Sequence, residues 1–116
     1  MKLETKAIKK NLLVDICGDI DHHSCEKIKQ RVEEDFKKLN CRNIILDLNA
    51  VNFMDSSGIG MIIGRYKLAK SYGGLLVAVR VNSACRKIFE ISGLLRLVAV
   101  FDSLEEALKG VDENVV

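Results

Sequence analysis

A short polar segment, Asp55-Ser56-Ser57-Gly58-Ile59, joins an apolar run to an amphipathic one. Ser56 falls at or beside the first residue of the predicted helix, where backbone N–H groups have no partner within the helix. A hydroxyl at this place, next to the carboxylate of Asp55, suits three roles. It can accept a phosphoryl group, it can help to hold an anion, or it can cap the helix.

The neighbours of Ser56 favour a functional role over a purely structural one. A serine in front of an apolar helix is commonly only an N-cap. Here Ser57 can cap the helix equally well, which leaves the Ser56 hydroxyl available for chemistry. The sequence does not decide whether Ser57 is an alternative acceptor. Gly58 and Gly60 follow, and residues without a side chain allow the backbone of a partner to approach closely.

Segments typical of strands and helices alternate along the chain. Apolar runs predict strands at 12–17, 44–48, 75–79 and 97–101, and a weaker one at 3–8 pairs with the first through a turn at 9–11. A spacing of three to four residues predicts four helices, with the apolar faces Cys25, Ile28, Val32, Phe36 and Leu39; Ile59, Ile62, Ile63, Tyr66 and Ala69; Cys85, Ile88 and Ile91; and Leu104, Ala107, Leu108 and Val111. This alternation is typical of an α/β domain with a largely parallel sheet.

Right-handed crossovers place the loops that follow parallel strands at one edge of the sheet. Residues 18–23 follow one predicted strand, residues 51–57 follow the next, and residues 81–83 follow a third. We call these three loops the rim. We expect Asp21 and Ser56 to face each other across it.

Length and charge limit the function classes. The 116 residues predict one domain, 1–116, with a flexible tail at 112–116. A net charge of +2 on scattered basic residues argues against nucleic acid as the main partner. No apolar run approaches the roughly 20 residues that cross a bilayer, and the N-terminus lacks a signal-peptide core. We therefore expect a soluble, cytoplasmic protein, monomeric when free and not attached to a membrane.

The four cysteines lie far apart and form no C-x-x-C pair. In a domain of this kind they are expected to be free thiols rather than a disulfide framework. Cys17 and Cys85 lie within or beside apolar segments, which predicts that both are buried.

Other chemistries fit the residues less well. Asp21, His22, His23 and Cys25 are ligand types for zinc, but adjacent histidines rarely face one metal, so no metal site is expected. The segment around Ser56 lacks the first glycine of a G-x-S-x-G nucleophile elbow, and no acid and histidine follow in the required order. Gly58 and Gly60 lack the rest of a nucleotide-binding loop. A phosphate-receiver domain would need a lysine at the end of the last strand, where Phe101-Asp102-Ser103 stands.

Four stretches in order resemble the anti-sigma factor antagonists, small bacterial proteins built on the STAS domain. The run from Phe53 to Gly60 resembles the signature of the family, and Gly18–His23 resembles its first loop. Gly64–Lys67 and Ser92–Leu94 resemble the segments that follow the signature helix and close the third helix. The first of these two, with Asp21-His22-His23, favours the sporulation branch, whose members act on the anti-sigma F factor.

This resemblance implies a single STAS domain of the α/β class. Its sheet is largely parallel with an N-terminal antiparallel strand, and its helices pack mainly on one face. Periodicity by itself does not choose this arrangement over a flavodoxin-like strand order.

The resemblance also implies a function. The unphosphorylated protein would bind an anti-sigma factor that is also a serine kinase, which releases a sigma factor for transcription. The kinase would phosphorylate Ser56 and end the interaction, and a serine phosphatase would restore the hydroxyl. The chain would be a substrate and ligand rather than an enzyme, without a cofactor. The alternatives are a general-stress antagonist and a weak nucleotide-binding STAS module.

The expected partner contacts lie around Ser56 on the rim: Asp21, His22, His23, Asp55, Ser57, Gly58 and Ile59. Asp21 has a second interpretation as a cap for the helix from Ser24. The segment Gly64–Lys67 either adds charge at the rim or simply continues the helix.

Overall fold

The strands of the sheet lie side by side in the same order as in the chain. The structure is a computed structural model that describes residues 1–113. In this part of the chain the strands are β1 (Lys2–Ile8), β2 (Asn11–Cys17), β3 (Asn43–Ala50), β4 (Leu76–Val79) and β5 (Ala99–Phe101). β1 runs antiparallel to β2, and the other neighbours are parallel. The predicted α/β sheet with an antiparallel N-terminal strand is confirmed.

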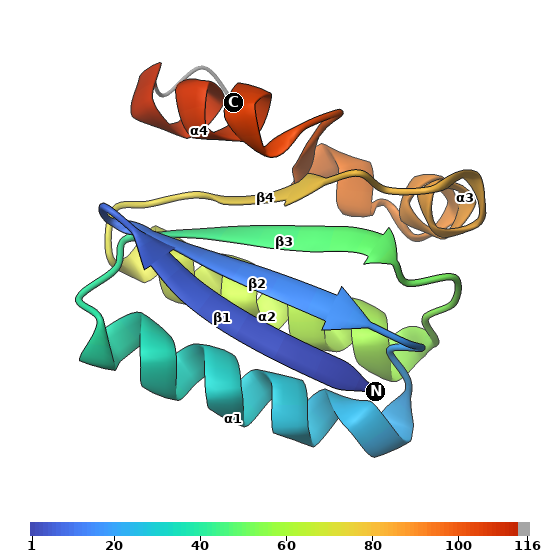
Figure 1. Ribbon diagram of the computed structural model, residues 1–116. Coiled ribbons are helices and arrows are strands. Elements are labelled where there is room, and N and C mark those ends of the chain that lie inside the picture. The colour runs from blue at the N-terminus through green and yellow to red at the C-terminus, as the bar shows by residue number, and fades with distance from the viewer. Residues whose placement is uncertain (114–116) are drawn as a thin grey trace.

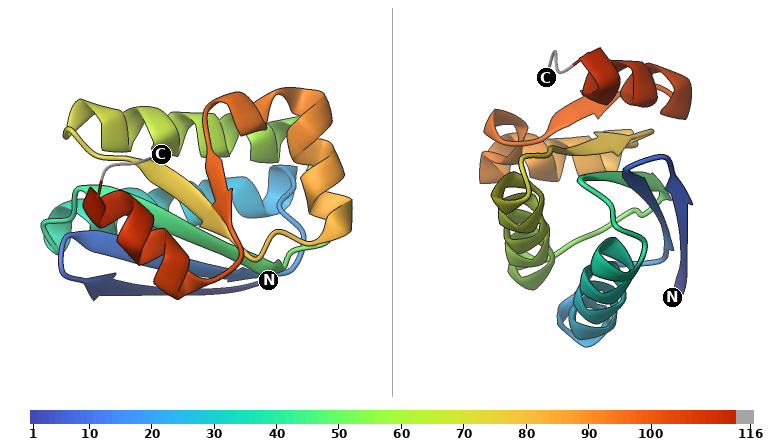
Figure 2. Two further views of the ribbon diagram at one scale, coloured as in Figure 1. Left: turned by 90° about the horizontal axis from the view of Figure 1, so that it is seen from above. Right: turned by 90° about the vertical axis from the view of Figure 1, so that its left-hand side faces the viewer.

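Four helices of the described residues cover the two faces of this sheet unequally. They are α1 (His22–Lys38), α2 (Ser56–Ser71), α3 (Ser83–Ser92) and α4 (Leu104–Glu113), and a short 3₁₀ turn, η1 (Leu94–Arg96), follows α3. Each of the first three connects one parallel strand to the next in the same direction across the sheet, so right-handed crossovers place them on one side. Figures 1 and 2 show α4 on the opposite side from α1 and α2.

Two apolar cores result from this layering. The larger joins alternate residues of β2 and β3, such as Val14 and Leu46, to Phe36 of α1, Ile62 of α2 and Phe89 of α3. The smaller lies under α4 and contains Ile45, Val77, Val79, Ala107 and Val111. β3 is buried from residue 43 to residue 48 because helices cover both of its faces.

Several details differ from the predictions, among them the last strand, which begins at Ala99 rather than at residue 97. α1 begins at His22 rather than Ser24, because Asp21 caps it. The buried face of α3 contains Cys85 and Phe89, four residues apart, so Ile91 points away from the core and is 81% exposed. Cys17 is exposed, because the side chains of β2 alternate and Ile16 takes the core-facing position.

The C-terminal helix continues further than predicted. α4 extends to Glu113, so residues 112 and 113 of the expected tail are helical. The buried Val111 packs this last turn against the smaller core. Residues 114–116 lie outside the described residues. All four cysteines are free thiols, as predicted. Within residues 1–113 the helices are too short or too polar to span a membrane.

Candidate functional site

Backbone hydrogen bonds join the first two loops of the rim. The Ile20 amide donates to the carbonyl of Phe53 at 3.0 Å, and the Asp55 amide donates to the carbonyl of Ile20 at 3.2 Å. Ile20 and Met54 form a short parallel bridge, and both side chains are buried. The pairing of β2 with β3 is thus resumed between the loops, which lie at the right-hand end of the sheet in Figure 1. The predicted convergence of these loops is confirmed.

The third loop of the rim is attached through Asn82. Its side-chain amide donates to the carbonyl of Val51 at 2.7 Å and to the side chain of Asn52 at 3.1 Å. Its side-chain oxygen accepts from the amide of Cys85 and so caps α3. One side chain therefore fixes the start of α3 against the loop that precedes Ser56.

The Asp55 carboxylate joins the N-termini of two helices. One oxygen accepts from the Gly58 amide at 3.0 Å and caps α2. The other accepts from the amide of His22, at the start of α1, at 3.1 Å. The prediction that a serine caps α2 is therefore wrong. The signal in the sequence was the aspartate directly in front of the predicted helix, because aspartate is a preferred N-cap residue whose side chain accepts from an amide of the first turn.

Ser56 and Ser57 have different surroundings. Ser56 is the first residue of α2 and is exposed, and no hydrogen bond from the part of the chain that the structure describes holds its hydroxyl. Ser57 is half-buried and lines a small cavity between α1 and α2. Because Asp55 performs the capping, the Ser56 hydroxyl takes no part in the cap and is exposed to solvent.

Gly58 has an internal role rather than a surface one. It is buried, and a Cβ atom at this position would lie 2.7 Å from the carbonyl oxygen of Ile20 and 3.0 Å from Cβ of Met54. The close approach of α2 to the first loop therefore requires glycine. The interpretation that Gly58 leaves room for a partner is therefore wrong, because Gly58 packs within the chain. Its neighbour Ile59 is half-buried and packs against the core.

Asp21 is the cap of α1, the second of its two interpretations. Its carboxylate accepts from the amides of His23 and Ser24, and the Ser24 hydroxyl accepts in return from the Asp21 amide at 3.0 Å. The hydrogen bond from the Ser24 amide is the main cause that lowers the pKa of Asp21. His22 and His23 are exposed on the first turn, so the rim presents two imidazoles beside this cap.

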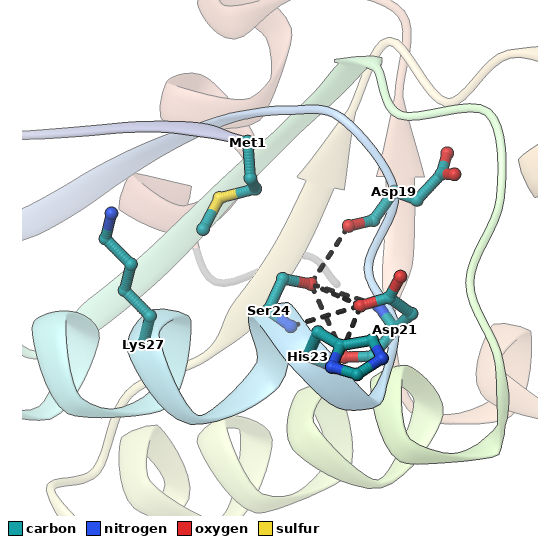
Figure 3. A pocket seen from close by; sticks show the side chains of 6 residues that line it. All are labelled: Met1, Asp19, Asp21, His23, Ser24 and Lys27. Carbon is teal, nitrogen blue, oxygen red and sulfur yellow. Dashed lines mark hydrogen bonds between the residues drawn. The ribbon is translucent and has the colours of Figure 1, made fainter.

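A cavity of about 410 Å³ lies on the Asp21 side of the rim (Figure 3). Its lining consists of Met1, Asp19, Asp21, His23, Ser24 and Lys27. Within residues 1–113 no three His, Cys, Asp or Glu side chains lie close enough together to hold a metal ion. The cavity does not reach Ser56, so it is a feature of the first loop.

One exposed aromatic residue on the rim was missed by the sequence reasoning. Phe53 is 49% exposed, three residues before Ser56. Its signal was an apolar side chain after the end of the predicted strand and before the cap of the next helix, where neither element buries it. Large exposed aromatic side chains are enriched at protein–protein contacts.

The segment Gly64–Lys67 continues α2 and does not add charge to the rim through its arginine. Arg65 is only 7% exposed and faces α1, where its Nη2 lies 3.4 Å from Oε2 of Glu33. Lys67 is exposed.

Comparison with known proteins places the chain in a family. A family model described as "STAS domain" matches residues 2–107. The anti-sigma F factor antagonist of Paenibacillus polymyxa is 32% identical over 93% of this chain and 92% of its own length. The anti-sigma-B factor antagonist of Bacillus subtilis is 24% identical over 86% of this chain and 90% of its own.

Solved structures show the same fold. The anti-sigma factor antagonist SpoIIAA in its unphosphorylated form has a TM-score of 0.82 at 24% identity, with 99% of both chains covered. The phosphorylated form of SpoIIAA, a Bacillus cell fate determinant, has a TM-score of 0.73 at 25% identity and covers 95% of this chain and 99% of its own.

Proposed function

The chain belongs to the STAS domain family, and we propose that it is an anti-sigma factor antagonist controlled by phosphorylation of Ser56. Unphosphorylated, it binds an anti-sigma factor that is also a serine kinase. The sigma factor that this anti-sigma factor held is then released for transcription in the cytoplasm. Phosphorylation of Ser56 ends the interaction, and a serine phosphatase reverses it. The chain is the substrate of these enzymes and not an enzyme itself.

The observation that carries this proposal is the exposed Ser56 hydroxyl beside a cap that another residue supplies. Asp55 caps α2 through the Gly58 amide, so modification of Ser56 removes no hydrogen bond of the fold. The loop 18–23 is fixed next to it, which offers a partner one continuous surface. We propose that the partner contacts this surface through Asp21, His22, His23, Asp55, Ser57 and Ile59, with Phe53 as an added apolar contact.

Physical chemistry supports a switch at the surface rather than a change of fold. A phosphate adds about −1.5 to −2 charges and three strong acceptors. At the first residue of a helix, free N–H groups and the helix dipole tolerate that charge. A partner that had covered the hydroxyl would meet a bulky dianion beside the Asp55 carboxylate. Losing about 3 kcal/mol at such a contact weakens binding on the order of a hundredfold.

The sporulation role is the finer part of the proposal. It is supported by the relative from Paenibacillus polymyxa, an anti-sigma F factor antagonist, and by Asp21-His22-His23 and Gly64–Lys67. The general-stress role is the second candidate, because the relative from Bacillus subtilis is an anti-sigma-B factor antagonist. Binding assays against anti-sigma factors of both classes separate the two roles, and we expect the sporulation class to bind more tightly.

The site is tested by incubating the protein with a candidate anti-sigma kinase and ATP and locating the phosphate by mass spectrometry. We expect one phosphate, on Ser56. Ser56→Ala should bind the kinase and remain unmodified, while Ser57→Ala serves as the matched control and should still be phosphorylated. A phosphate on Ser57, or undiminished modification of Ser56→Ala, would reject Ser56 as the acceptor.

A further inference from the structure

A cavity of about 220 Å³ lies between α1 and α2, beside the rim. Glu26 and Lys29 of α1 and Ser57, Gly60, Met61 and Arg65 of α2 contribute to its lining. Ser56 does not line it. The cavity therefore excludes the proposed phosphorylation site, although it shares Ser57 with the surface proposed for the partner.

Arg65 supplies an unusual group to this cavity. The residue is 7% exposed, and within residues 1–113 its buried Nε and Nη1 atoms have no hydrogen-bond partner. Its Nη2 lies 3.4 Å from Oε2 of Glu33, which is long for a charge-assisted hydrogen bond. A guanidinium has five N–H donors, and buried donors of this kind are nearly always partnered. The structure thus holds a buried cation whose donors are largely unused.

Of two further glycines in α2, Gly60 lines this cavity and Gly64 does not. Gly60 and Gly64 lie inside the helix, where glycine is among the poorest helix formers. A Cβ atom at either position would meet nothing within 4 Å. Packing within the described chain therefore does not require glycine here, in contrast to Gly58. At Gly60 the missing side chain leaves the wall of the cavity open.

The charges around the cavity are of both signs, so the unused donors of Arg65, rather than the net charge, favour an anion. Arg65 and the exposed Lys29 are cationic, whereas Glu26 is the anionic residue of the lining. The half-buried Glu33 already lies beside Arg65. The cavity is smaller than the roughly 300 Å³ at which pockets for drug-sized ligands begin, which suits a single phosphate or carboxylate group rather than a nucleotide.

We propose that the cavity between α1 and α2 binds a small oxyanion, with the Arg65 guanidinium and the Lys29 ammonium as its donors. A free phosphate ion and a carboxylate presented by another molecule share this chemistry. The proposal does not depend on Ser56, so its failure would leave the proposed switch untouched.

The test is a titration of the ¹⁵N-labelled protein, followed by amide chemical shifts, with inorganic phosphate and in parallel with acetate. Sodium chloride keeps the ionic strength constant, which removes general screening effects. We expect saturable shifts confined to residues around Ser57, Gly60 and Arg65. Saturation by phosphate identifies a tetrahedral anion, and saturation by acetate identifies a carboxylate. No saturable shift with either anion would overturn the proposal.

Variants show which donors hold the anion. Lys29→Met should weaken binding by about tenfold, while Lys37→Met, an exposed lysine of the same helix outside the cavity, should leave it unchanged. Arg65→Met should abolish binding. If that variant does not fold, Gly60→Leu decides, because it places a side chain at the cavity wall and should also abolish binding. Undiminished binding in Lys29→Met together with Gly60→Leu contradicts the assignment.

Discussion

At the scale of single residues, the Asp55 carboxylate fixes the start of its own helix, α2, to His22 of α1, 33 residues earlier in the chain. One oxygen caps α2 and the other holds the His22 amide of α1. The loop that carries His22 and His23 is therefore attached to the loop that carries Ser56. This residue determines the shape of the rim without itself being modified.

Replacing this carboxylate should destabilise the protein. We expect Asp55→Ala to lower the free energy of unfolding by about 1–2 kcal/mol, because the caps of helices are worth this much and the His22 amide also loses its acceptor. Asp55→Asn is the matched control, since an amide oxygen still caps, and it should lose less. Urea denaturation measures both. Equal stability of Asp55→Ala and the wild type would remove Asp55 from this role.

The cap of α1 should give a defined pH dependence. Hydrogen bonds, first of all from the Ser24 amide, lower the pKa of Asp21 in the folded protein below its ordinary 3.8. Its contribution to stability is therefore complete above pH 3.8 and is lost as the pH falls through the folded pKa. The stability advantage of the wild type over Asp21→Asn should shrink below pH 3.8.

Unfolding curves of both proteins over a range of acidic pH values test this expectation. Burial raises the pKa of Asp35, but hydrogen bonds from Thr5 and Arg31 outweigh it and leave the pKa lowered. Because both proteins contain Asp35, its effect cancels in the difference. Parallel stability profiles across the acid range would show that Asp21 is not stabilised as a carboxylate.

The sequence predicted the place of Ser56 but not the residue that caps its helix. A serine and an aspartate in consecutive positions are both good caps, and a shift of one residue in the helix start exchanges their roles. The choice is made by the His22 amide, which needs an acceptor and finds it in Asp55. That contact comes from another part of the chain and leaves no local signal.

At the scale of elements, α2 contains glycines with opposite structural meaning. Gly58 faces the carbonyl of Ile20 at a distance that excludes a side chain, whereas Gly60 and Gly64 face open space. The three are equivalent in the sequence. Their difference arises only when α2 packs against the loop 18–23.

This difference predicts opposite effects of the same substitution. Gly58→Ala should destabilise the protein by about 1–3 kcal/mol, because the methyl group forces α2 away from Ile20. Gly64→Ala should stabilise it by about 0.5–1 kcal/mol, because alanine favours the helix and meets no neighbour. Thermal unfolding measures both. The account of α2 packing fails if Gly58→Ala is the more stable of the two.

The buried face of a helix was predicted correctly where the apolar pattern is long and only in part where it is short. In α1 the spacing of Ile28, Val32 and Phe36 identifies the buried side, and all three are fully buried. In α3 the predicted Cys85 is buried and Ile88 packs partly buried against the core, but Ile91 is exposed and Phe89 is buried instead. Ten residues contain too few repeats to distinguish two faces that differ by one position.

At the scale of the whole molecule, the strand order determines where the chemistry lies. Because β2, β3 and β4 are parallel neighbours in chain order, their following loops meet at one edge, and Figure 2 shows α1 and α2 side by side beneath the sheet. The alternation of strands and helices predicted a parallel sheet, while the choice of this order came from family resemblance. The cavity with Arg65 was not predicted, since its burial depends on how α1 and α2 pack.

The fold should not change when Ser56 carries a phosphate. The residue is exposed, its hydroxyl makes no hydrogen bond within residues 1–113, and the helix is capped by Asp55. We therefore expect the amide spectrum of the phosphorylated protein to differ from that of the unmodified protein only near the first turn of α2 and the loop 18–23.

The most direct test is the dissociation constant of the complex with an anti-sigma kinase, measured by calorimetry for the unmodified and the enzymatically phosphorylated protein. We predict that phosphorylation weakens binding on the order of a hundredfold, equivalent to about 3 kcal/mol, while the amide spectrum outside the rim stays the same. Equal affinity of the two forms, or spectral changes throughout the sheet, would contradict a switch that acts at the surface.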